Sequence, residues 1–316
     1  MLRPAQASPW LPGCGRRSMS DGVTPSLEEL VALRALAGRS RMAGRVRTAW
    51  AGTAPSPLRG RGMEYAESRE YTAGDDARHV DWRLTARTGR PHTKVFHAER
   101  ERLTLIVADT APALYFGTRV RFKSVQAARA GALVAWAAVA DGDRVAALRG
   151  APREAPVAPA GGPRGALRVI DALRRWYARR PEDGAGLADA LEHAQRLLRP
   201  GARLVVLADA SSLEAVPAHR WVGLARHHEV VLILPCDPLE LEPPRMRLPF
   251  ATPAGRVELP LDAPAVRQRW LEAFAAPLRH ALQELPTRGV RAIALSTDEP
   301  TERCLAPLRG AVAQVA

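Results

Sequence analysis

The sequence predicts an α/β fold in which helices cover both faces of a mostly parallel sheet, and two observations indicate this. Residues 103–108, 203–208 and 229–234 are short continuous apolar runs, which is the pattern of buried parallel strands. Segments with helical periodicity alternate with these runs, and such alternation is typical of parallel sheets with helices on both sides. The chain has 316 residues and an apolar fraction of 47%, enough for one large domain or two smaller ones.

The N-terminal part predicts a tail followed by a helix. Residues 1–24 are rich in Pro, Gly, Ser and Arg, so we expect a disordered tail. Ser26 is a suitable N-cap, and Glu28 and Glu29 follow in the first turn of the expected helix. Residues 51–62 predict a loop, because their Arg-Gly-Arg-Gly lacks the Gly-Lys-Ser/Thr of a phosphate-binding loop.

Residues 64–100 concentrate charges of both signs among aromatic and turn residues. They are either a polar loop with a chance balance of charge or a semi-buried ion-pair network that shapes a platform. We favour the network, because mixed charges beside aromatic side chains persist mainly when they are paired. The platform has no nucleophile–base or metal-ligand spacing, so we interpret it as structural and as a candidate docking surface. Its expected members are Arg69, Tyr71, Gly74, Asp75, Asp76, Arg78, Asp81, Trp82 and Arg87.

The remaining elements follow in order along the chain. Further strands are expected at residues 93–97, 144–148 and 291–295, and a β-hairpin at 246–261; helices are expected at 123–140, 164–178, 186–198, 213–226, 263–285 and 301–308, and a loop at 150–163. The expected organisation is a tail at 1–24, an N-terminal motif region at 25–99 and an α/β domain at 100–316. A small β-hairpin insertion is expected around residues 239–262 within that domain.

The basic character of the chain does not by itself predict nucleic-acid binding. The formal net charge is +13, but only Lys94 and Lys123 are lysines, so 44 of the 46 basic residues are arginines. This excess of Arg resembles a coding bias, and no basic run is interleaved with aromatic residues. We therefore expect no nucleic-acid partner, although an Arg-driven nucleic-acid binder stays as an alternative.

Cysteine use and hydropathy point to the cytoplasm. The three cysteines, at positions 14, 236 and 304, are far apart and form no Cys-x-x-Cys pair, so neither a disulfide framework nor a zinc site is expected. No apolar run reaches about 18 residues, and therefore no membrane insertion is expected.

Two acids follow directly on buried strands. Asp109 and Asp209 are expected at the carboxyl edge of the sheet, where ligands of such folds collect. They could hold a divalent cation such as Mg²⁺, but Ala111 and Ala113 supply no further oxygen ligands. The common catalytic and dinucleotide motifs are absent from the sequence. Cys236 is expected to be a packed apolar residue, with a nucleophile as the alternative.

The motifs of the N-terminal part resemble those of the domain-of-unknown-function 58 family. The matching segments are Gly62-x-Glu64-Tyr65, Ser68-Arg69-x-Tyr71, Ala73-Gly74-Asp75-Asp76-x-Arg78-x-Val80-Asp81-Trp82 and Thr85-Ala86-Arg87, continued by Phe96, Glu99-Arg100, Asp237-Pro238-x-Glu240 and Ser296-Thr297-Asp298. The resemblance covers the chain from about Pro25 onward. It implies a Rossmann-like von Willebrand factor A-type domain at residues 100–316.

Domains of that type commonly carry a metal-ion-dependent adhesion site. Asp109 matches its first acid and Asp209 its last, but Ala111 and Ala113 replace both serines, and residues 184–187 contain no threonine. The resemblance therefore implies a degenerate site. We expect no cofactor, with Mg²⁺ at the two acids as the alternative.

The family is typically encoded beside MoxR-type AAA+ ATPases. The resemblance thus implies a non-enzymatic adaptor that helps such an ATPase act on a client protein. A metal-dependent hydrolase using Asp109 and Asp209 is the enzymatic alternative.

Overall fold

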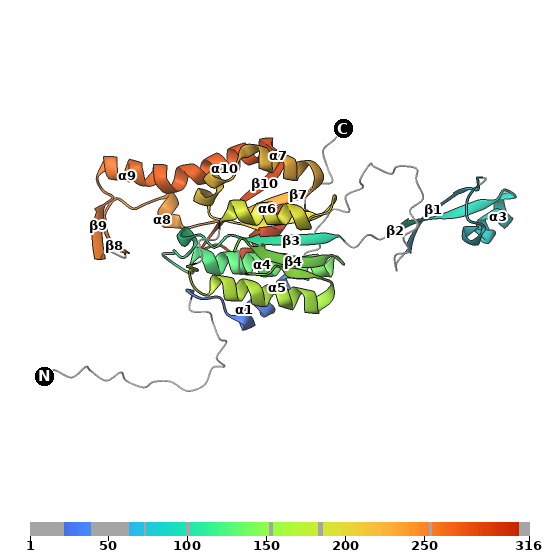
Figure 1. Cartoon of the computed structure of the whole chain (residues 1–316), viewed down its shortest axis with the longest axis horizontal. Coiled ribbons are helices and arrows are strands. Elements are labelled where there is room, and N and C mark those ends of the chain that lie inside the picture. The colour runs from blue at the N-terminus through green and yellow to red at the C-terminus, as the bar shows by residue number, and fades with distance from the viewer. Residues whose placement is uncertain are drawn as a thin grey trace, which may run out of the picture. The chain divides into compact units, whose positions relative to one another are not determined.

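The computed structural model describes residues 22–38, 63–72, 74–98, 102–151, 154–182, 186–252 and 255–309. The chain divides into two compact units. The first unit contains residues 22–38 together with residues 103–309, and the second contains residues 63–98 (Figure 1).

A six-stranded sheet forms the centre of the first unit, with the strand order β10-β7-β6-β3-β4-β5. Neighbouring strands are parallel except for β5, which pairs antiparallel with β4. The strands span Leu103–Ala108 (β3), Arg144–Arg149 (β4), Val157–Ala160 (β5), Arg203–Leu207 (β6), Glu229–Cys236 (β7) and Val290–Ser296 (β10). The predicted mostly parallel sheet is therefore confirmed.

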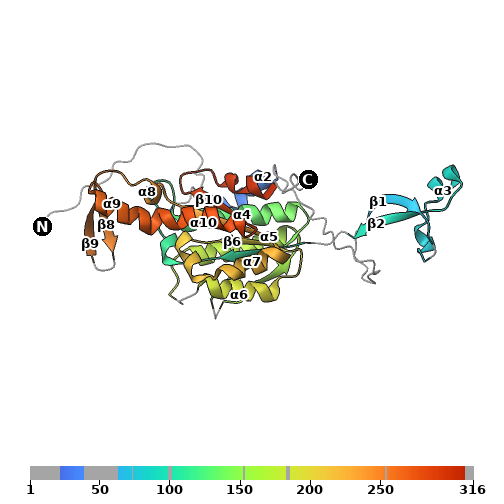
Figure 2. The same ribbon diagram turned by 90° about the horizontal axis from the view of Figure 1, so that it is seen from above.

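Helices cover both faces of this sheet (Figures 1 and 2). Successive side chains of a strand point to opposite faces, so Ile106 enters one core with α4 and α5, and Leu105 enters the other with α6, α7 and α10. The five helices span Lys123–Ala140 (α4), Gly162–Tyr177 (α5), Leu187–Leu197 (α6), Ala218–His227 (α7) and Ala276–Thr287 (α10). Gly131 lets α4 approach α5 closely, because a Cβ atom there would lie 2.7 Å from Cδ1 of Leu173.

The N-terminal helices belong to the first unit rather than to the motif region. Helices α1 (Leu27–Ala32) and α2 (Arg34–Ala37) bury Leu30, Leu33 and Ala37 in the core on the α4 and α5 side. The indole Nε1 of Trp136 on α4 donates to the carbonyl of Leu30 at 3.2 Å. The expected region of residues 25–99 is thus divided between two units.

A hairpin and a long helical segment follow β7, as predicted. Strands β8 (Arg247–Thr252) and β9 (Gly255–Pro260) pair antiparallel. Helix α9 (Pro264–Trp270) continues through a π-helical turn into α10. Short elements complete the unit: η2 (Pro112–Leu114), η3 (Ala210–Ala215), α8 (Pro238–Leu241), η5 (Thr301–Leu305) and α11 (Ala306–Arg309).

Two expectations differ from the structure in the first unit. Residues 150–163, expected as a loop, include the edge strand β5; Pro159 is tolerated there because an edge strand leaves one side unpaired. Residues 213–226, expected as one helix, divide into η3 and α7 at Pro217, whose ring has no N–H for a continuous helix.

The second unit consists of one strand pair and two short helices. Strands β1 (Met63–Glu70) and β2 (His92–Ala98) pair antiparallel, and η1 (Ala77–His79) and α3 (Trp82–Thr88) lie between them in the chain. Gly89 ends α3 with φ of 73°, a left-handed conformation that favours glycine. Across the ranges that the structure describes, none of the helices in either unit has the length and apolar character needed to cross a membrane.

Candidate functional site

Four polar residues follow the parallel strands at one edge of the sheet. Ala108 of β3 pairs in register with Leu207 of β6, so Asp109 and Asp209 both lie at the carboxyl edge. Asp237 follows β7, and Thr297 follows β10. All four are buried, with exposed fractions between 0% and 6%. This edge is the candidate functional site of the first unit.

Lys123 places a positive charge at this edge. It is the first residue of α4, and its side chain is only 2% exposed. Its Nζ atom lies 2.7 Å from Oδ2 of Asp209 and 2.6 Å from Oε1 of Glu240, which lies in α8. One ammonium group thus joins two carboxylates that are 86 and 117 residues away in the chain.

The pKa values of these three groups follow from burial and mutual charge. Burial disfavours the charged form of Lys123, but Asp209 and Glu240 outweigh it and raise the pKa of Lys123. Burial also opposes ionisation of Asp209, yet the charge and hydrogen bond of Lys123 lower the pKa of Asp209. Burial raises the pKa of Glu240, and Lys123 offsets this only in part. The ammonium group therefore offsets part of the cost of burying both carboxylates.

The carboxylate of Asp109 is occupied by donors from the chain. Its Oδ1 atom accepts the backbone N–H of Ala111 at 2.9 Å, and its Oδ2 atom accepts the backbone N–H of Asp209 at 3.1 Å. Burial raises the pKa of Asp109, while a hydrogen bond from the Ser212 side chain and the two backbone bonds oppose the rise.

The fully buried hydroxyl of Tyr177 has no hydrogen-bond partner in the described ranges. Burial, followed by the charge of Asp109, raises the pKa of Tyr177.

Asp237 ties three segments of the chain together. Its carboxylate accepts the backbone N–H of Thr118 at 2.9 Å, the hydroxyl of Thr118 at 2.5 Å and the hydroxyl of Thr297 at 2.7 Å. It also caps α8 through the N–H of Leu239, while Glu240 accepts the N–H of Asp237 to complete a capping box. Asp237 is thus a structural acceptor, and the capping box fixes the Glu240 carboxylate that Lys123 contacts.

The arrangement at the carboxyl edge does not fit a divalent cation. Asp209 is neutralised by Lys123, Asp109 accepts N–H groups, and Ala111 and Ala113 supply no side-chain oxygen where an adhesion site has serines. Among the residues whose positions are described, no group of three or more His, Cys, Asp or Glu side chains could hold a metal ion. An ammonium group lies where a cation would have to approach Asp209.

Asp109 and Asp209 were predicted at this edge from the sequence, whereas Lys123 was not, and Glu240 appeared only as part of a family motif. Lys123 lies at the start of a predicted helix, and nothing local in the sequence links it to acids more than 80 residues away. One signal was present: only two lysines remain in a chain with 46 basic residues. The ammonium group of Lys is a compact point charge with three donors on a flexible stem, so one such group can contact two carboxylates.

Neither of the two described cysteines supplies a reactive thiol. Cys236, the last residue of β7, is 5% exposed, and burial together with the charge of Glu240 raises its pKa to about 12. Cys304 is fully buried, and burial raises its pKa to about 12 as well. Both cysteines behave as packed apolar residues.

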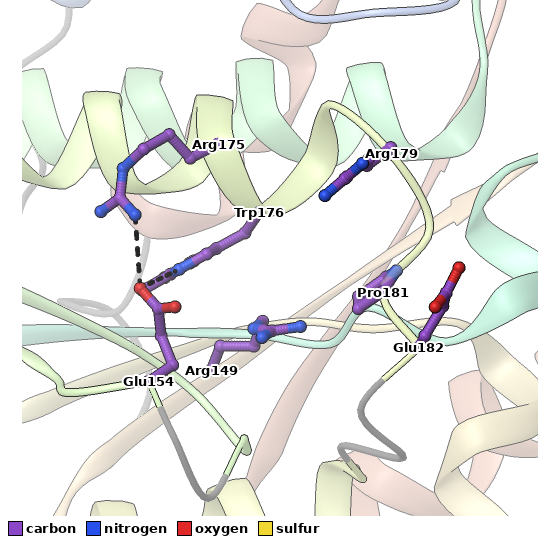
Figure 3. A pocket seen from close by; sticks show the side chains of 7 residues that line it. All are labelled: Arg149, Glu154, Arg175, Trp176, Arg179, Pro181 and Glu182. Carbon is purple, nitrogen blue, oxygen red and sulfur yellow. Dashed lines mark hydrogen bonds and ion pairs between the residues drawn. The ribbon is translucent and has the colours of Figure 1, made fainter.

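A cavity of about 460 Å³ lies beside the end of β4 (Figure 3). Oε1 of Glu154 accepts Nε1 of Trp176 at 2.9 Å and a guanidinium N–H of Arg175 at 3.4 Å. Among the described residues, its lining contains no His, Cys, Ser or Thr side chain, and its two acids are Glu154 and Glu182. Its residues are Arg149, Glu154, Arg175, Trp176, Arg179, Pro181 and Glu182.

In the second unit, Asp75 holds part of the predicted ion-pair network. Its carboxylate contacts Arg69 at 2.7 Å and accepts the backbone N–H of Thr72 at 2.9 Å. The hydroxyl of Tyr71 donates to the carbonyl of Asp75 at 2.9 Å, and Gly74 supports the turn with φ of 110°. The hydrogen bond from Thr72 and then that from Arg69 lower the pKa of Asp75.

The other acids of the expected platform are helix caps. Asp76 accepts the backbone N–H of Arg78 and caps η1. Asp81 accepts the backbone N–H of Leu84 at 3.1 Å, which caps α3, and the hydroxyl of Ser68 at 2.9 Å. The hydrogen bonds from Leu84 and then Ser68 lower the pKa of Asp81.

The side chains of three exposed members take no part in the hydrogen bonds and ion pairs of the described network. Trp82 is 72% exposed, and neither Arg78 nor Arg87 forms an ion pair with a residue in the described ranges. Asp76 and Asp81, two acids of the expected network, accept backbone N–H groups. The structure thus separates the platform into a hydrogen-bonded part and an exposed Arg and Trp part.

Comparisons with known proteins identify relatives of this chain. Residues 67–280, more than half of the chain, match the family described as "Protein of unknown function DUF58". Uncharacterized proteins of Mycobacterium bovis and of two strains of Mycobacterium tuberculosis are 30% identical over 250 residues, which is 76% of this chain and 76% of each relative. No solved structure matches the chain significantly.

Proposed function

The chain belongs to the DUF58 family of proteins of unknown function, and from this premise we propose that it is a non-enzymatic interaction protein that works with a MoxR-type AAA+ ATPase. In this proposal the first unit is a von Willebrand factor A-like domain with a degenerate adhesion site. The complex assembles or remodels a client protein in the cytoplasm. The ATPase supplies the energy, and this chain supplies binding surfaces.

The observation that carries the proposal is the ion pair of Lys123 with Asp209 and Glu240. A catalytic metal at this edge would need the carboxylates that Lys123 already neutralises. The sheet edge therefore favours a domain that binds partners without a divalent cation.

The other groups of the first unit also favour binding over catalysis. The thiols of Cys236 and Cys304 have pKa values of about 12 and are buried, so they are poor nucleophiles. The described lining of the cavity beside β4 carries guanidinium and carboxylate groups and no thiol, hydroxyl or imidazole side chain. Together with the ion pair at the sheet edge, these features support the proposed binding role over the alternative of a metal-dependent hydrolase using Asp109 and Asp209.

Co-purification with a MoxR-type ATPase encoded in the same genome tests the proposal. The tagged full chain is mixed with the ATPase without nucleotide, with ADP and with a non-hydrolysable ATP analogue, and an unrelated AAA+ ATPase serves as the control. We expect association with the MoxR-type ATPase alone, in at least one nucleotide state. Absence of association in all three states refutes this function.

A further inference from the structure

We propose that one exposed side of helix α3 binds an acidic segment of a partner protein. This surface, the α3 face, consists of Trp82, Arg83, Ala86 and Arg87. The inference rests on the proposed function, because it assigns the interaction protein a contact surface and gives the chemistry of its partner.

Helical geometry places these four residues together. With 3.6 residues per turn, Trp82 and Ala86 lie one above the other, as do Arg83 and Arg87. All four are exposed. On the opposite side of α3, Leu84 is half-buried, and the hydroxyl of Thr85 accepts the backbone N–H of His92 at 3.0 Å. The helix is therefore fixed by one side and presents the other to solvent.

Trp82 is the unusual member of this face. It is 72% exposed, more than any other large hydrophobic residue in the described ranges, the next being Met246 at 52%. Most of this large apolar side chain is therefore left in solvent, where it adds little to the stability of the fold. Trp and Arg are the residue types most enriched where protein partners contribute most binding energy.

Among the residues that the structure describes, no acid forms an ion pair with the arginines of the face. Arg83 and Arg87 are four residues apart on a helix, where like charges repel. The neighbouring acids are engaged elsewhere, since Asp81 caps α3 and Asp75 contacts Arg69. Carboxylates from a partner would supply the missing counter-charge and a bidentate match to each guanidinium.

The charge of the whole unit favours a protein partner over a nucleic acid. Across the unit, residues 46–102, eleven basic and eight acidic side chains leave a net charge of only +3, and within residues 63–98 six of each sign cancel. Nucleic-acid binding needs a broad positive field and usually several aromatic platforms, and Trp82 is the single strongly exposed aromatic residue among the described side chains of this unit. The positive charge is instead local, which suits a short acidic segment.

A peptide-binding measurement with the full chain tests the α3 face. The probe is a fluorescein-labelled twelve-residue peptide of Glu and Asp with two Leu, followed by anisotropy at about 50 mM salt so that screening is weak. The test variant carries Trp82→Ala and Arg87→Glu. The matched control carries Phe274→Ala and Arg279→Glu, which change another exposed aromatic residue and another exposed arginine in the first unit. We expect wild type and control to bind alike, and the test variant at least about tenfold more weakly, a difference of about 1.4 kcal/mol.

Three results overturn the proposal: no binding of the peptide to wild type, equal binding to all three proteins, or displacement of the peptide by a single-stranded oligonucleotide whose own binding depends on Trp82. Should the test variant fail to fold, the variant Arg83→Glu with Arg87→Glu, which retains Trp82, replaces it. The same weakening of peptide binding is expected for this variant. The peptide arm does not involve the ATPase. If wild type binds the peptide but does not associate with the ATPase, only the proposed function is refuted. If wild type and the test variant associate equally with the ATPase, the α3 face does not contact the ATPase.

Discussion

The Nζ atom of Lys123 lies 2.7 Å from Oδ2 of Asp209, and both groups are nearly excluded from solvent. Glu240 contacts the same ammonium at 2.6 Å. Desolvated charges are stable only when they are paired and hydrogen-bonded. Each member of this cluster therefore depends on the others, and the cluster joins α4, the loop after β6 and α8.

Replacing the ammonium group should destabilise the first unit strongly. Lys123→Met keeps much of the side-chain volume but leaves the carboxylates of Asp209 and Glu240 buried without their cation. We expect the free energy of unfolding to fall by about 3–5 kcal/mol, the usual cost of breaking a buried ion pair on one side. Urea denaturation measures this. The control is Lys94→Met, which changes the only other lysine, an exposed one; equal losses for the two variants would show that Lys123 is not a buried partner.

The same variant should show an altered dependence of stability on pH. In wild type the pKa of Asp209 is lowered, so its contribution is present above the unfolded pKa and is lost only as the pH falls through the folded pKa. In Lys123→Met the buried carboxylates should have raised pKa values. They become protonated as the pH falls, and the cost of burying their unpaired charge is then removed. The difference in unfolding free energy should therefore be largest near pH 7 and shrink towards pH 4. A difference that stays constant or grows in acid would contradict the ion pair.

Both described cysteines should resist alkylation in the folded protein. With a pKa of about 12, the thiols of Cys236 and Cys304 are almost fully protonated at pH 8. Iodoacetamide labelling followed by peptide mass spectrometry should find neither residue modified in the native state, and both modified in concentrated urea. Rapid native labelling of Cys236 would instead support the nucleophile that the sequence left as an alternative.

Asp81 and Arg78 should differ in their effect on the second unit, although the sequence placed both in one network. Asp81→Ala removes the cap of α3 and the partner of Ser68, so the amide of Leu84 should exchange its hydrogen several times faster. Arg78→Ala removes an exposed side chain without an ion pair to a described residue, so exchange should stay unchanged. Hydrogen exchange of peptides covering α3 compares them, and faster exchange in Arg78→Ala would place its guanidinium in the network after all.

The central sheet could be predicted because its strands are buried on both faces. Continuous apolar runs such as residues 103–108 and 203–208 have few other interpretations in an α/β chain. The edge strand β5 could not be predicted in this way. It has only four residues, contains Pro159, and leaves its middle residues exposed, so it lacks the apolar run of a central strand.

The candidate site was predictable only in part, for a topological reason. Asp109 and Asp209 each follow a recognisable strand, and parallel strands bring their carboxyl ends to one edge. Lys123 and Glu240 are placed at that edge by α4 and α8. A local sequence pattern does not predict where the first residue of a helix lies relative to the end of a distant strand. The exposure of Trp82 was missed because a charged and aromatic stretch looks the same whether its acids pair with arginines or with backbone N–H groups.

Titration of Mg²⁺ into the full chain at pH 7, followed by calorimetry, tests most directly whether Lys123 takes the place of a divalent cation at the sheet edge. The Asp209→Asn variant serves as the control, because it removes the carboxylate that a cation would need. We predict no saturable heat for wild type at millimolar Mg²⁺, the upper range of weak protein sites for divalent cations. A saturable one-site heat in wild type that disappears in Asp209→Asn would contradict the account.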